Sequence, residues 1–93
     1  MKITNINGTS DTICSCGSWL KHWANFSGKS VPYFCPVIGC KNTNLEGAHV
    51  QKENNLKWYI CPLCKEHNQS SETLEIPNDF TLVSANKKET CEK

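Results

Sequence analysis

The sequence lacks arginine, and all ten of its basic residues are lysines. The planar guanidinium of arginine binds phosphate and guanine through two parallel hydrogen bonds, so this mode of nucleic-acid recognition is excluded. Nine acidic residues leave a formal net charge of +1. This balance excludes a strongly basic nucleic-acid clamp and an acidic tail, because both depend on a large excess of one charge.

Long apolar runs are also missing. The apolar stretches around 31–38 and 58–63 are short and interrupted, well below the roughly 20 residues that a membrane-spanning helix needs. The opening residues MKITNINGTSDT contain no apolar core of a secretory signal. We therefore expect a cytoplasmic protein with no membrane partner, in a compartment where cysteines stay reduced.

The chain is short, and 93 residues are enough for one domain. We expect residues 1–93 to form a single domain in which the polar residues 1–13 are a flexible arm. A core of this size usually needs a disulfide, a metal ion or a partner to hold it together. Seven cysteines offer such a staple, at positions 14, 16, 35, 40, 61, 64 and 91.

A helix is predicted over residues 18–28, where the apolar residues recur at the spacing of one helical face: Trp19, Leu20, Trp23 and Phe26. A serine can cap the start of this helix and a glycine can end it. We expect the aromatic face to be buried, with an exposed stacking platform as the alternative.

The remaining elements are short. Residues 45–50 and 56–61 read as two strands of a β-hairpin, joined by the polar residues 51–55. Pro62 can open a short helix over 62–71, and 73–76 and 80–85 are further strand candidates. The chain is thus predicted to be a small α+β domain with an N-terminal aromatic helix and short C-terminal strands.

The strongest chemical pattern is Cys35-Pro-Val-Ile-Gly-Cys40 followed by Cys61-Pro-Leu-Cys64. Thiolates are soft donors that suit tetrahedral zinc, and four of them complete a structural site. Cys35, Cys40, Cys61 and Cys64 are therefore the predicted zinc ligands. The order of knuckle, hairpin and helix is that of a treble-clef zinc finger, which we expect over residues 35–69.

Three cysteines lie outside this pattern, namely Cys14, Cys16 and Cys91. They could form a second metal site with His22, or one disulfide that ties the chain ends together, or remain reduced. The sequence leaves these three readings open.

The layout from Cys35 to Asn68 resembles the His-Asn-His endonuclease family, whose members carry a treble-clef fold. The stretches CSCGSWLKHW, GAHVQK, WYICPLCKEHN and LVSAN are also similar to those of small bacterial and phage zinc-binding proteins. The family resemblance implies that His49 on the first hairpin strand is a general base. It also implies that Asn54 or Asn55 orients the site from the hairpin loop, with Asn55 preferred.

The same resemblance implies that His67 and Asn68 help to hold a catalytic Mg²⁺ or Mn²⁺ ion. The family usually places a metal-binding histidine or aspartate directly before the base, where this chain has Ala48. His49 can also be a structural histidine, and His67 can instead be a zinc ligand in place of Cys64.

The leading hypothesis is therefore a zinc-stabilised module that binds DNA, RNA or a protein through a degenerate nuclease fold. An active metal-dependent nuclease is the first alternative, and a secreted disulfide-rich effector is the second. None of these hypotheses implies a small organic cofactor.

Overall fold

Five antiparallel strands form one sheet in the order β4-β1-β2-β3-β5. The computed structural model describes residues 1–6, 16–86 and 90. The strands are β1 (Lys2–Asn5), β2 (Leu45–Lys52), β3 (Tyr59–Cys64), β4 (Thr73–Glu75) and β5 (Val83–Ser84), and the helices are α1 (Trp19–Ser27) and α2 (Lys65–Asn68). The expected small α+β class is confirmed. No helix within the described ranges has the length and apolar character to cross a membrane.

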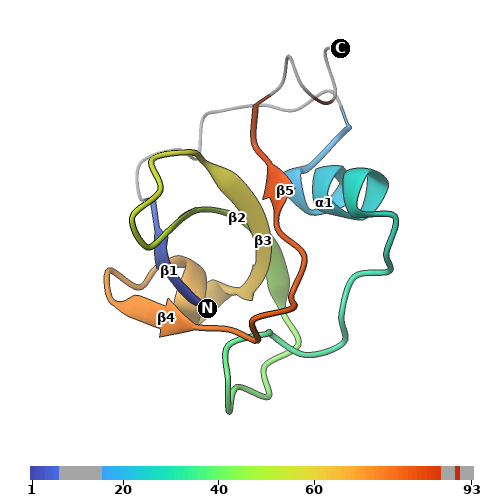
Figure 1. The fold of residues 1–93 in the computed structure, drawn as a ribbon. Coiled ribbons are helices and arrows are strands. Elements are labelled where there is room, and N and C mark those ends of the chain that lie inside the picture. The colour runs from blue at the N-terminus through green and yellow to red at the C-terminus, as the bar shows by residue number, and fades with distance from the viewer. Residues whose placement is uncertain (7–15, 87–89, 91–93) are drawn as a thin grey trace.

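Strand β1 lies inside the sheet, hydrogen-bonded to β2 on one side and to β4 on the other (Figure 1). Its Ile3 is fully buried in the core because alternate residues of a strand face opposite sides. Residues 2–5 of the expected arm over 1–13 therefore form a strand within the sheet. Residues 7–13 lie outside the described residues.

Helix α1 forms where the apolar periodicity predicts it. The Ser18 side chain accepts a hydrogen bond from the Lys21 amide, and Gly28 ends the helix in the left-handed conformation. Trp23 is buried, stacks on Phe80 at 5.7 Å between ring centroids, and donates its indole N–H to a backbone carbonyl. The aromatic face of the helix therefore serves mainly for packing, as expected.

The β2–β3 hairpin is the centre of the sheet and is longer than the sequence pattern suggests. Leu45 pairs with Cys64 and Val50 with Tyr59, so β3 stays extended through the second cysteine. Pro62 lies within this strand, opposite Gly47, instead of opening a helix. Helix α2 begins only after Cys64, which corrects the predicted helical start at residue 62.

The two faces of the hairpin pack against different neighbours. On one face, Ala48 and Val50 join a core with residues of β1, β3 and β4. On the other face, Ile60 packs with Trp23 of α1 and with β5. Figure 1 shows α1 lying beside β5 on this second side, so the sheet separates two clusters of buried side chains.

At Gly47 the backbone of α1 lies directly against the sheet. A Cβ atom at this position would lie 2.4 Å from both the Leu20 nitrogen and the Trp19 carbonyl carbon. These atoms belong to the backbone of the first helical turn, so no side-chain rotation can relieve the overlap. The absence of a side chain at Gly47 therefore sets the distance between α1 and β2.

We expect Gly47→Ala to destabilise the fold by about 1–3 kcal/mol or more, because the helix must move away from the sheet. Gly28→Ala is the matched comparison: its Cβ would meet nothing within 4 Å, and only the left-handed backbone, with a φ of 69°, opposes it. That strain costs about 1 kcal/mol. Chemical denaturation of both variants measures the difference, and equal losses would contradict a steric role for Gly47.

Candidate metal centre

The chain from Cys35 to Asn42 forms a closed loop beneath the sheet. The Cys35 amide donates to the Asn42 carbonyl at 2.8 Å, and the Cys40 amide donates to the Val37 carbonyl at 2.9 Å. Gly39 supplies the positive φ of 86° that this turn requires. The two hydrogen bonds hold Cys35 and Cys40 at the two sides of one compact turn.

A second pair of donors comes from the junction of β3 and α2. Cys64 is the N-cap residue of α2, and His67 is the third residue of this short helix. Residues three apart on a helical turn lie on the same side, which brings the Cys64 Sγ within 3.1 Å of the His67 Nδ1. The helix is one turn long, and it presents this histidine to the loop.

The loop and the junction bring four potential ligands together: Cys35, Cys40, Cys64 and His67. Their ligand atoms all lie within 4.8 Å of one another, so the group could hold a metal ion. The Cys40 and Cys64 sulfurs are 3.9 Å apart, and the Cys35 Sγ is 3.6 Å from the His67 Nδ1. A tetrahedral site with bonds of about 2.3 Å to sulfur and about 2.0 Å to nitrogen requires spacings of about 3.8 Å and about 3.5 Å.

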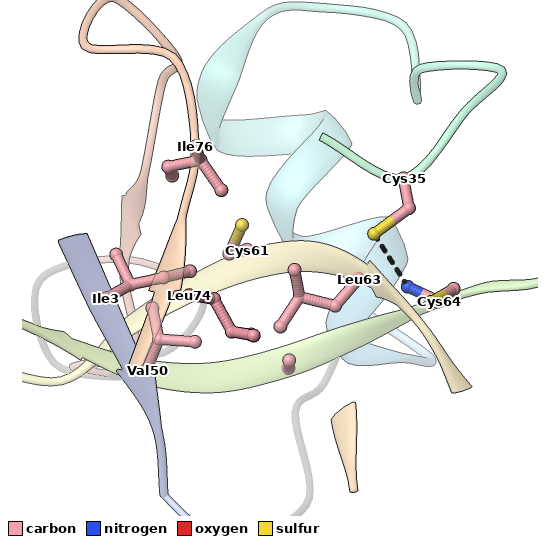
Figure 2. Close-up of a cluster of buried hydrophobic side chains, with 9 residues drawn as sticks. Ile3, Cys35, Val50, Cys61, Leu63, Cys64, Leu74 and Ile76 are labelled. Carbon is pink, nitrogen blue, oxygen red and sulfur yellow. Dashed lines mark hydrogen bonds between the residues drawn. The ribbon is translucent and has the colours of Figure 1, made fainter. Parts of the chain in front are cut away.

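One of the four predicted zinc ligands lies outside this group. Cys61 does not belong to the group of four; it is fully buried in the hydrophobic core, among Ile3, Leu74 and Ile76 (Figure 2). In an extended strand, residues three apart point to opposite faces, so Cys61 and Cys64 cannot close on one ion as they would on a turn. Burial also raises the pKa of the Cys61 thiol, which keeps it protonated.

The fourth member of the group is His67, where Cys61 was predicted. The spacing Cys64-Lys-Glu-His67 has the same two intervening residues as a Cys-x-x-Cys pair. Had the strand been predicted to continue through Cys64, Cys61 and Cys64 would have faced opposite sides, and His67 would have been the preferred partner of Cys64. His67 was expected as a zinc ligand only in place of Cys64, whereas both residues belong to the group.

Two of the three cysteines in the group, Cys35 and Cys64, are buried, whereas Cys40 is partly exposed. Burial raises the pKa of the Cys35 thiol to about 11, so its thiolate form needs a nearby positive charge. The Cys64 amide donates to the Cys35 sulfur at 3.4 Å (Figure 2). A divalent cation at the centre of the group would supply the charge that this environment lacks.

The four residues proposed for catalysis do not come together. His67 belongs to the group of four potential ligands, which we call the metal group. Asn68 donates its side-chain N–H to Glu46 at 2.8 Å, and the Asn68 backbone carbonyl accepts a hydrogen bond from Asn5. Asn55 shapes the hairpin turn by accepting the Lys57 amide proton. These hydrogen bonds hold Asn55 within the hairpin loop and tie Asn68 to β1 and β2.

His49 lies on the opposite face of β2 from Ala48 and its core. Its ring contacts Trp19 at 4.6 Å and Trp58 at 5.9 Å between centroids. The residue is only 5% exposed, and its Nε2 has no hydrogen-bond partner among the residues that the structure describes. The strand itself therefore separates His49 from the side on which Glu46 holds Asn68.

Of the remaining cysteines, Cys16 precedes α1 and is partly exposed. Cys14 and Cys91 lie outside the described residues, so the three readings of this set stay open. His22, their suggested companion, is fully buried, and its Nε2 lies 2.9 Å from the Ser84 carbonyl oxygen.

Comparison with known proteins gives no match to a family model, a curated protein or a solved structure. The resemblance to the His-Asn-His family and the treble-clef assignment therefore stay predictions. The geometry of the four ligand atoms carries the functional argument.

The surroundings of His49 give stability a pH dependence. Burial, and then the charge of His22, lower the pKa of His49 below its ordinary value of about 6.5. As the pH falls, the unfolded chain takes up this proton before the folded chain does. The stability that neutral His49 contributes is therefore complete above about pH 6.5 and is lost as the pH falls below it.

We expect His49→Gln to reduce the loss of unfolding free energy between pH 7.5 and pH 5.5, by at most about 1.4 kcal/mol per pH unit for one proton. Denaturation of the wild type and the variant at matched zinc concentration measures it. Protonation of the thiolates affects both proteins alike, so the difference isolates His49. Parallel stability curves would show that its environment does not disfavour the charged ring.

Proposed function

We propose that Cys35, Cys40, Cys64 and His67 bind one zinc ion that has a structural role. The observation that carries this proposal is the close approach of four ligand atoms, all within 4.8 Å. Three thiolates and one imidazole are donors typical of structural zinc. Four protein ligands fill a tetrahedral shell and leave no position for a reacting water, which argues for a structural ion over a catalytic one.

The ion would connect parts of the chain that are distant in sequence. Cys40 and Cys64 are separated by 24 positions, and the hairpin lies between them. Binding would fix the 35–42 loop to the end of β3, in addition to the packing of Cys35 and Val37 against the core. The free energy of zinc binding would thereby stabilise the folded form of the 35–42 loop and of the junction between β3 and α2.

We expect the purified chain to lose one equivalent of zinc when Cys64 is replaced by serine. Cys61→Ser is the matched control, three residues away in the same strand, and should keep that zinc despite some loss of core stability. His67→Cys should also keep the zinc, because four thiolates form an equally suitable set. Metal analysis after dialysis gives the stoichiometry, and circular dichroism reports folding.

The opposite pattern, with zinc retained in Cys64→Ser and lost in Cys61→Ser, would refute the proposed ligand set. Equal stoichiometry in all variants would place the bound zinc elsewhere in the chain.

We further propose that the domain is a binding module and that its partner is a protein. Five of the seven exposed large apolar residues within the described ranges lie between Phe26 and Ile38. Tyr33 is 76% exposed and Ile38 is 64% exposed, although Cys35 lies between them. The two cysteines of the loop would therefore fix these side chains at the surface.

Charge supports a protein partner over a nucleic acid. No charged residue occurs from Ser30 to Cys40, so this segment offers no positive charge to phosphate. Aromatic side chains in uncharged surroundings are typical of the centre of protein interfaces. Nuclease activity has no support from the geometry, because His49 is separated by the strand from Asn68.

We expect the double variant Tyr33→Ser, Ile38→Ser to change the unfolding free energy by less than about 0.5 kcal/mol, because both side chains are largely exposed. Denaturation at saturating zinc measures this. A large loss would show that the two residues serve packing and would remove the argument for a partner. Salt-dependent binding of the chain to single- or double-stranded oligonucleotides would instead favour a nucleic acid.

A further inference from the structure

Asn42 stands between the metal group and the helix that carries its histidine. Its side-chain amide nitrogen lies 3.5 Å from the Cys64 sulfur and 3.3 Å from Oε2 of Glu66. Both neighbours are acceptors, so the NH₂ end of the amide faces them. The backbone carbonyl of Asn42 closes the loop by accepting the Cys35 amide proton. This hydrogen bond places the Asn42 side chain beside the ligands.

The charge of the group explains why such a donor matters. Three thiolates around a divalent ion leave one net negative charge, and two of the sulfurs are buried. The Cys35 sulfur receives the Cys64 amide proton. The Asn42 side chain offers the corresponding donor to the Cys64 sulfur, which is fully buried. An N–H group directed at a thiolate spreads its charge without competing for the metal.

We propose that Asn42 is a positioning residue that tunes metal affinity through its hydrogen bond to the Cys64 thiolate. The inference rests on the proposed zinc site and deepens it. Asn42 contributes no ligand; it stabilises the deprotonated sulfur and orients it toward the ion. Partners of this kind typically change metal affinity by about 10- to 100-fold.

The contact between Asn42 and Glu66 provides an alternative explanation for any effect of Asn42 on metal affinity. Asn42 could act only by tying α2 to the loop through the Glu66 carboxylate, and so affect His67 indirectly. Glu66→Gln replaces the carboxylate with an amide and leaves the Asn42–Cys64 contact in place. The Glu66 carboxylate itself also interacts with the Cys64 side chain, so this variant controls for every contact of Glu66 while the Asn42 donor stays present.

The test is competition for zinc between the full-length protein and a chelator of known affinity, at fixed pH and ionic strength. We expect Asn42→Ala to weaken zinc binding about 10- to 100-fold. Asn42→Asp should weaken it further, because the isosteric carboxylate places a negative charge beside the thiolate and Glu66. Glu66→Gln should change affinity by less than about threefold, well below the range for a thiolate partner.

Cobalt substitution gives a readout that loss of folding alone would not move. Removing the N–H donor raises the energy of the sulfur lone pairs, so the sulfur-to-cobalt charge-transfer band should shift to longer wavelength in Asn42→Ala and stay in place in Glu66→Gln. Wild-type zinc affinity in Asn42→Ala would overturn this inference alone. Equal losses in Asn42→Ala and Glu66→Gln, with no band shift, would overturn the role of the sulfur contact. A wild-type chain that binds no zinc would overturn the proposed function as well.

Discussion

The extended backbone of β3, which continues through Cys64, determines how the rest of the structure is arranged. Because the strand does not turn at Pro62, Cys61 faces the hydrophobic core and Cys64 reaches the end of the sheet. The chain then bends into α2 at once, so that Cys64 and His67 share one helical turn. Cys61 and Cys64 are both buried thiols with the same chemistry. The conformation of the strand therefore determines which of them belongs to the metal group.

The same hairpin keeps two groups of titratable residues apart. One face of β2 carries the core that continues toward the metal group, and the other carries His49 within a set of aromatic rings. A mechanism that needs a base and a metal ion at one phosphate requires them on the same side. The histidine that the family resemblance singled out is instead packed beneath Trp58, a side chain that remains nearly half exposed.

Much of the fold follows from local patterns in the sequence. The period of Trp19 and Trp23, with its serine cap and terminal glycine, predicts α1 to within a residue at each end. The hairpin is also found, and three of the four residues in the metal group are expected. The place of β1 inside the sheet is not predictable, because only one of its four residues is apolar and its partners lie far away in the chain. The fourth ligand is missed because a proline between cysteines suggests a turn, whereas pairing with Gly47 keeps the strand straight.

The position of β1 also has a consequence that we expect for folding. Residues 2–5 pair with residues 50–52 and with residues 73–75, so the sheet is completed only when distant segments meet. The metal group, by contrast, lies wholly between residues 35 and 67 and encloses the hairpin. Short loops close sooner and at lower entropic cost than long ones, so the segment around the ion can organise first. Strand β1 would then pair with an edge that is already formed. During synthesis, residues 2–5 would stay unpaired until residues 50–52 and 73–75 had been made.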